Sequence, residues 1–216
     1  AIDLPIIGFT IVNRPGLIRN MLDKSNYLRY HMQTDNESYF DYFESIFSDT
    51  VTITADITPS YSGLQKSRLS SIYSGFKQRD IDCKAVMLLR DPVDRIKSAV
   101  RYNLDRKNYD EGIENGETDF LQALEQYYKS EHCTIRTRYD KTIESVRGVF
   151  DEKDIYIGIY EEMFESDKID DVSKFFGIQA KYDFASVRVN KTKSATTVNH
   201  DIEQNIKNFY SEVYEL

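Results

Sequence analysis

The sequence predicts an α/β fold, in which a central parallel sheet of about four or five strands is flanked by layers of helices. Short apolar runs at residues 4–9, 85–89 and 155–160, and a β-branched run at residues 51–54, have the length and composition of strands. Segments between them, such as residues 64–76, repeat apolar side chains at helical spacing. Strands that alternate with helices of this length form right-handed βαβ units, and such units build a parallel sheet.

Length and composition limit the class of protein. A chain of 216 residues predicts one domain over residues 1–216, large enough for a substantial core. The net charge of −8 argues against a nucleic-acid or anionic-membrane partner, since such partners require basic surface. No apolar run has membrane-spanning length and no signal peptide is visible, so we expect a cytoplasmic protein whose Cys83 and Cys133 are reduced. The cysteines and histidines form no metal-binding pattern, so no metal is expected.

Residues 1–76 are expected to contain three helices and two strands. After the strand at 4–9, helices are expected at 17–28 and 39–47, the second with aromatic residues at the spacing of a core face. The β-branched run at 51–54 predicts a strand that ends just before Asp56. A proline turn follows at Pro59, and the next helix covers residues 64–76.

The segment at 84–102 organises the rest of the chain. Residues 85–89 predict a strand buried on both faces, and Arg90 follows at its carboxyl end. Asp91 then suits an N-cap and Pro92 a first helical position, which places Ser98 about two turns into a helix. Ligands of open α/β sheets bind at this end of the strands, where a cation and a hydroxyl can hold a phosphate. The alternative is a capped helix start with Arg90 paired to nearby carboxylates.

The second half continues the same alternation. The polar segment 103–118 predicts a surface loop, and helices are expected at 120–128 and 139–150. A strand at 155–160 precedes a helix for which Gly177 is the natural C-cap. A last helix, with an apolar stripe from Ile202 to Val213, ends the chain.

Residues 90–98, RDPVDRIKS, resemble the 3′-phosphate-binding motif of the sulfotransferases that use 3′-phosphoadenosine 5′-phosphosulfate (PAPS), particularly the carbohydrate type. Residues 56–61 (DITPSY), residues 160–162 (YEE) and residues 175–178 (FFGI) resemble further segments of that family, in the family's order. The resemblance implies a P-loop-like three-layer domain that binds PAPS. It also implies that Arg90 and Ser98 hold the 3′-phosphate.

Two loops complete the implied cofactor site. Gly8 and Thr10 fit the beginning of the family's loop around the 5′-end of PAPS, whose lysine has no counterpart here. Either that loop has degenerated or residues are missing after Thr10; in the first case Arg14 and Arg19 are possible substitute cations. The basic segment 188–197 resembles the loop that brings Lys191 and Lys193 to the 3′-phosphate, and a solvated surface loop is its alternative.

The resemblance leaves the catalytic base open. Ser25 stands where related enzymes carry a glutamate, and serine cannot serve as the base. His31 and Asp56 are therefore the two candidates, because either side chain can accept a proton near neutral pH. Arg95, inside the predicted helix, is expected to form only a surface pair with Asp91 or Asp94.

The implied activity is transfer of a sulfuryl group from PAPS to a hydroxyl or amine of a carbohydrate or small molecule, without a metal. One alternative is a degenerate relative that binds a nucleotide or glycan without turnover. Another is a P-loop kinase-like phosphotransferase, although that class requires the motif GxxxxGK[ST], which is not evident. The oligomeric state is left open.

Overall fold

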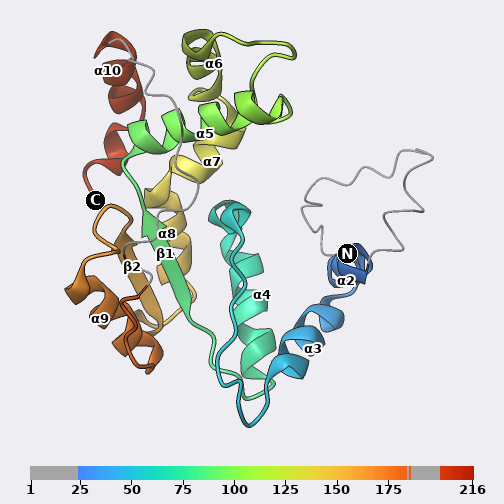
Figure 1. Cartoon of the computed structure of the whole chain (residues 1–216). Coiled ribbons are helices and arrows are strands. Elements are labelled where there is room, and N and C mark those ends of the chain that lie inside the picture. Colours follow the sequence, from blue (N-terminus) through green and yellow to red (C-terminus); the bar gives the residue numbers. More distant parts are fainter. Residues whose placement is uncertain (1–23, 184, 186–199) are drawn as a thin grey trace. The chain divides into compact units, whose positions relative to one another are not determined.

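The computed structural model describes residues 24–183, 185 and 200–216 (Figure 1). The chain divides into two compact units. The first comprises residues 1–57 and 74–82, and the second comprises residues 58–73 and 83–216. The expectation of a single domain stays a prediction.

The described part of the first unit is a helical pair joined to the end of a third helix. It contains α2 (Lys24–Thr34), α3 (Asn36–Ile46) and the last turn of α4 (Lys66–Lys77). Asp35 caps α3 by accepting a hydrogen bond from the Glu37 N–H. Phe40, Phe43 and Phe76 pack edge to face in this unit, which confirms that the aromatic residues of α3 are core residues.

The predicted strand at residues 51–54 is wrong. Residues 51–58 form neither helix nor strand, and the Val51 backbone forms hydrogen bonds with Ser48. Val51 and Ile53 are exposed, so this β-branched run has no packing surface that would favour a strand. Asp56 consequently does not lie at the end of a strand.

The described part of the second unit carries the sheet and the remaining helices. In chain order it contains η1 (Pro59–Gly63), the first two turns of α4, β1 (Ala85–Leu89), α5 (Pro92–Arg106), α6 (Phe120–Tyr127), α7 (Glu131–Thr137), α8 (Tyr139–Arg147), η2 (Glu152–Asp154), β2 (Ile155–Ile159), α9 (Ser166–Phe176), α10 (His200–Phe209) and η3 (Ser211–Val213). Most of these bounds lie within a few residues of the predicted ones. The short helix α7 was not predicted, and α5 extends into the segment expected to be a loop.

The sheet is small. Over the described ranges it consists of β1 and β2, which lie side by side and pair in parallel from Ala85↔Ile155 to Leu89↔Ile159 (Figure 1). The parallel pairing agrees with the predicted α/β class, whereas four or five strands are not seen in the described chain. Because parallel strands end at the same edge of a sheet, the residues after Leu89 and after Ile159 are neighbours, and the Tyr160 N–H donates to the Leu89 carbonyl at 2.7 Å.

The two faces of β1 differ, contrary to the prediction that both are buried. Val86 and Leu88 are exposed, whereas Ala85, Met87 and Leu89 pack against core residues. The larger of the two cores in this unit joins α5, α6, α7 and α10, with Ile96, Leu124 and Ile206 fully buried. This core fixes α5, the helix that begins directly after Arg90. None of the helices in the described part of the chain has the length and apolar character needed to span a membrane.

Candidate functional site

Arg90 occupies the two-residue turn between β1 and α5, as the sequence predicted (Figure 1). Pro92 begins the helix, and its fixed φ suits that position. The Asp91 carboxylate caps the helix by accepting a hydrogen bond from the Asp94 N–H at 3.0 Å. The strand, the turn and the helix therefore form one rigid element that sets the direction of the Arg90 side chain.

The Arg90 guanidinium lies beside residues that follow β2. Its carbon is 5.1 Å from the centre of the Tyr160 ring, a cation–π contact, and its Nε is 3.8 Å from a carboxylate oxygen of Glu161. That distance is too long for a hydrogen bond. The Nε atom is buried and has no hydrogen-bond partner among the described residues. A buried donor without a partner is costly, and an anionic ligand would satisfy it.

Both oxygens of the Asp91 carboxylate are occupied. One accepts a hydrogen bond from the Asp94 N–H, and the other accepts one from the Tyr214 hydroxyl at 3.1 Å. The Asp91 N–H in turn points to Glu161 at 3.4 Å. Tyr139 also reaches this turn, since its hydroxyl interacts with the Arg90 backbone. Tyr214, Glu161 and Tyr139, from three different parts of the chain, thus contact this turn.

Ser98 lies on α5, about two turns from its start, and is partly buried. The structure therefore places Arg90 and Ser98 on the same continuous element, as predicted. The adjacent Lys97 is engaged elsewhere, because its ammonium pairs with Glu203 at 2.8 Å and with Asp94 at 3.4 Å. Lys97 thereby links α5 to α10.

Arg95 corrects the expectation of a surface pair with Asp91 or Asp94. Its side chain turns inward and donates to the Thr137 hydroxyl at 2.5 Å and to the Cys133 sulfur at 3.1 Å. The Tyr127 hydroxyl also interacts with it, although burial keeps the pKa of Tyr127 above its usual value. Local sequence patterns do not indicate these bonds, because α7 lies about forty residues further along the chain and was not predicted.

The two candidate bases belong to the first unit. His31 lies on α2, and its ring packs edge to face with those of Tyr27 and Tyr30, whose centroids are 4.4 and 6.1 Å away. The exposed Asp56 accepts a hydrogen bond from the Tyr39 hydroxyl at 3.2 Å. The predicted cofactor residues Gly8, Thr10, Lys191 and Lys193 lie outside the described residues, as do Arg14 and Arg19.

His132 is the histidine of α7, and its ring contacts Arg136 and Glu111. His132 on α7 accepts a hydrogen bond at Nδ1 from Arg136 at 2.7 Å, and its Nε2 is 3.4 Å from Glu111. Burial, followed by the charge of Arg136, lowers the pKa of His132, which favours the neutral ring. In the part of the chain that the structure describes, no three His, Cys, Asp or Glu residues are grouped to hold a metal ion.

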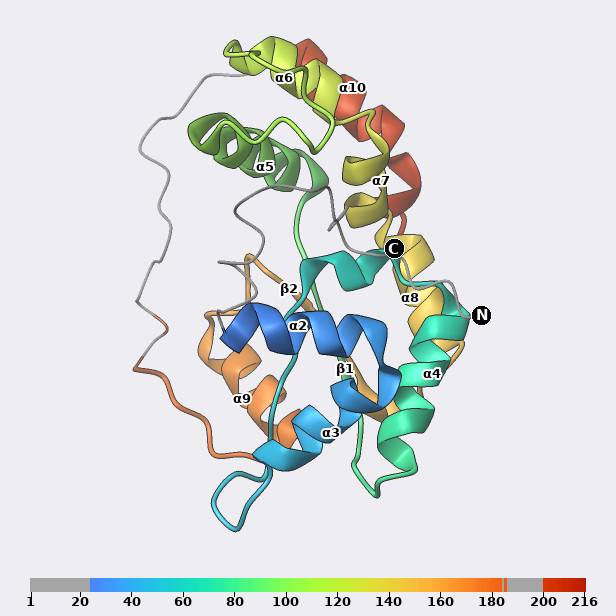
Figure 2. The ribbon, with the colours of Figure 1, turned by 90° about the vertical axis from the view of Figure 1, so that its right-hand side faces the viewer.

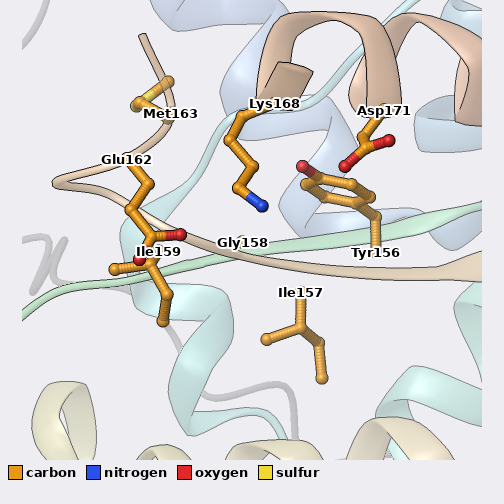
Figure 3. Close-up of a pocket in the computed structure, with 8 residues that line it drawn as sticks. All are labelled: Tyr156, Ile157, Gly158, Ile159, Glu162, Met163, Lys168 and Asp171. Carbon is orange, nitrogen blue, oxygen red and sulfur yellow. The ribbon is translucent and has the colours of Figure 1, made fainter. Parts of the chain in front are cut away.

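A pocket of about 160 Å³ adjoins β2. Its walls come from β2, the turn after it and α9, and Figure 3 shows Lys168 of α9 reaching toward the strand between Glu162 and Tyr156. The residues that line it are Tyr156, Ile157, Gly158, Ile159, Glu162, Met163, Lys168 and Asp171. None of the predicted site residues is among them.

Sequence reasoning missed the residues that surround Arg90. Tyr160 and Glu161 were noted only because residues 160–162 resemble a family segment. Parallel pairing of the strands at 85–89 and 155–160 would have placed both residues beside Arg90. Tyr214 carries no such signal, since its contact joins positions 123 residues apart.

A comparison with known families identifies the chain. The model of the sulfotransferase domain matches residues 17–215. The chain belongs to the sulfotransferase family. A search of curated proteins and a search of solved structures each found no match. Membership makes this protein a sulfotransferase-type transferase with a P-loop-like α/β fold, and the matched range includes β1, α5 and β2, the elements that build the turn at Arg90.

Proposed function

We propose that this protein transfers a sulfuryl group from PAPS to a hydroxyl or amine of a carbohydrate or small molecule. The observation that carries the proposal is the Arg90 guanidinium, which stands at the carboxyl end of a parallel strand with a buried Nε that lacks a partner among the described residues. This is the edge at which α/β sheets bind ligands. A 3′-phosphate would supply the missing acceptor.

We assign the binding of the 3′-phosphate to Arg90 and Ser98, which lie on the continuous element formed by β1, the turn and α5. Arg90 donates charge-assisted hydrogen bonds to the 3′-phosphate, and the hydroxyl of Ser98 donates from α5 to the same group. Lys191 and Lys193 add positive charge at that phosphate, while the backbone at Gly8 and Thr10 binds the 5′-end. PAPS supplies an activated sulfuryl group, and the protein supplies its position and the neutralisation of its charge.

The reaction is an in-line displacement. The acceptor oxygen or nitrogen forms a bond to sulfur while the bond from sulfur to the 5′-phosphate oxygen breaks, which releases 3′-phosphoadenosine 5′-phosphate (PAP). A base removes the acceptor proton, and we assign that role to His31 or Asp56. Replacement of the true base lowers turnover by about a hundredfold or more and leaves PAP affinity nearly unchanged.

The test is calorimetric titration with PAP and with AMP, which lacks the 3′-phosphate. Wild-type protein should bind PAP more tightly than AMP, and Arg90→Ala should weaken PAP binding at least about tenfold, because hydrogen bonds between charged groups contribute about 1.5–3 kcal/mol. The matched control is Arg106→Ala, which removes the same charge from the exposed end of α5. Equal PAP affinity in Arg90→Ala and wild type would contradict the assignment.

Transfer itself needs a second measurement. Incubation with PAPS and a panel of glycans, lipids and small alcohols should yield a sulfated product from at least one acceptor class. Binding of PAP without any transfer would instead identify a nucleotide-binding member of the family that lacks turnover.

A further inference from the structure

Glu161 contributes the carboxylate that lies beside the Arg90 guanidinium. It reaches the turn after β1 from the other strand, because β1 and β2 are parallel and end at the same edge of the sheet. Figure 2 shows β1 continuing into α5 through this turn. One carboxylate oxygen of Glu161, Oε1, is 3.8 Å from the Arg90 Nε and 3.4 Å from the Asp91 backbone nitrogen. A single negatively charged oxygen thus faces two N–H donors of the turn.

Neither of these two contacts is a strong hydrogen bond. Donor and acceptor atoms of an N–H···O bond are ordinarily about 2.7–3.2 Å apart, so the contact with Asp91 is long and the one with Arg90 is too long. The Arg90 Nε stays buried without a hydrogen-bond partner in the described part of the chain. The two donors therefore form a position for an anionic oxygen that the Glu161 carboxylate fills incompletely, and a phosphate oxygen that came closer would bind there more strongly.

The carboxylate can leave this position at small cost. The exposed fraction of the Glu161 side chain is 44%, and that of the Arg90 side chain is 33%. An ion pair that is this open to solvent contributes little to stability. The backbone before Glu161 is held by the hydrogen bond from the Tyr160 N–H to the Leu89 carbonyl, so the side chain can turn toward solvent while the strand pairing stays intact.

We propose that Glu161 competes with the 3′-phosphate for Arg90: its carboxylate fills the anion position in the free protein and is displaced when the nucleotide binds. The inference rests on the proposed function, because it concerns the same guanidinium. The negative charge of Glu161 weakens the binding of PAP, since like charges placed together are unfavourable. Return of the carboxylate to the turn favours release of PAP after transfer, a step that limits the turnover of many enzymes.

The test compares Glu161→Gln with Glu162→Gln by calorimetric titration with PAP and with AMP. Glu162 is the matched control, because it is also exposed and follows Glu161 directly, but its side chain lines the pocket at β2. Glu161→Gln should tighten PAP binding about three- to tenfold and change AMP binding by less than about twofold. Glu162→Gln should change PAP binding by less than about twofold. Weaker PAP binding in Glu161→Gln, or equal gains in the two variants, would overturn the inference.

A double-mutant cycle makes the test specific to Arg90. In an Arg90→Ala background, Glu161→Gln should improve PAP affinity by less than about twofold, because the group for which Glu161 competes is gone. An undiminished gain in that background would overturn the inference. Glu161→Ala removes the carboxylate altogether and should also tighten PAP binding, which provides a second variant should Glu161→Gln fold poorly.

The outcomes also separate this inference from the proposed function. A wild-type protein that binds PAP no more tightly than AMP overturns the proposed function and this inference with it. Preference of the wild type for PAP, without a gain in Glu161→Gln, overturns the inference alone.

Discussion

At the scale of single residues, Arg90 and Arg95 differ although one motif contains both: Arg90 is the proposed binding group, and Arg95 is bonded to the core. The two side chains are five residues apart, and only Arg90 has an unsatisfied donor at the edge of the sheet while remaining near solvent. The Nε of Arg95 also lacks a partner among the described residues, but its terminal nitrogen is bonded to α7. Arg95 therefore connects the proposed binding helix to the core.

Replacement of Arg95 should reduce stability. Arg95→Ala removes hydrogen bonds from a charged donor to Thr137 and Cys133, so we expect the free energy of unfolding to fall by about 1.5–3 kcal/mol. Arg106→Ala is the matched control, and as an exposed substitution it should cost no more than about 0.5 kcal/mol. Equilibrium unfolding in urea measures both. If the two variants have the same midpoint, Arg95 has no structural role.

At the scale of the elements, local signals predicted the structure well where neighbouring residues decide it. The strand at 85–89, the Asp91 cap and the helix that begins at Pro92 were all predicted from a run of eight residues, and all are present. The same holds for the cap at Gly177. These features depend on backbone preferences and capping, which act within a few residues.

Features that depend on distant partners were predicted poorly. The run at 51–54 has a strand-like composition but forms no strand, and the contact between Tyr214 and Asp91 joins residues 123 positions apart in the chain. The helix α7 is only seven residues long, and its start depends on Ser130 accepting from the Cys133 N–H. The positions of Arg90 and Ser98 could be predicted because both lie on one local element, whereas those of Tyr160 and Glu161 depend on the strand pairing.

The end of α9 allows a clean test of backbone conformation. Gly177 has φ +67°, and among the described residues no atom beyond its chain neighbours lies within 4 Å of the position that a Cβ would take. Gly177→Ala should therefore lower the free energy of unfolding by about 1–2 kcal/mol through left-handed strain alone. Gly177→Asn should cost less, because asparagine tolerates this conformation. Thermal unfolding of the two variants gives the comparison, and an alanine variant as stable as wild type would exclude the expected strain.

At the scale of the whole molecule, His132 should couple stability to pH. Because burial and Arg136 lower its pKa in the folded state, the unfolded chain binds more protons at and below pH 6.5. The contribution of the neutral ring is complete above that pH and is lost as the pH falls from about 6.5 toward the lowered value. Urea unfolding at pH 7.5 and 5.5 should show a larger loss of stability in wild type than in His132→Asn. Equal losses would mean that His132 titrates alike in both states.

The two cysteines bear on how the protein can be labelled. Burial raises the pKa of Cys83 to about 11, and Cys133 is fully buried in the larger core. Since the thiolate is the reactive form, maleimides and similar reagents should modify neither site in the native protein at neutral pH. A single cysteine introduced on an exposed helix position would then carry a fluorophore or spin label at one known place, with both natural thiols left in the chain.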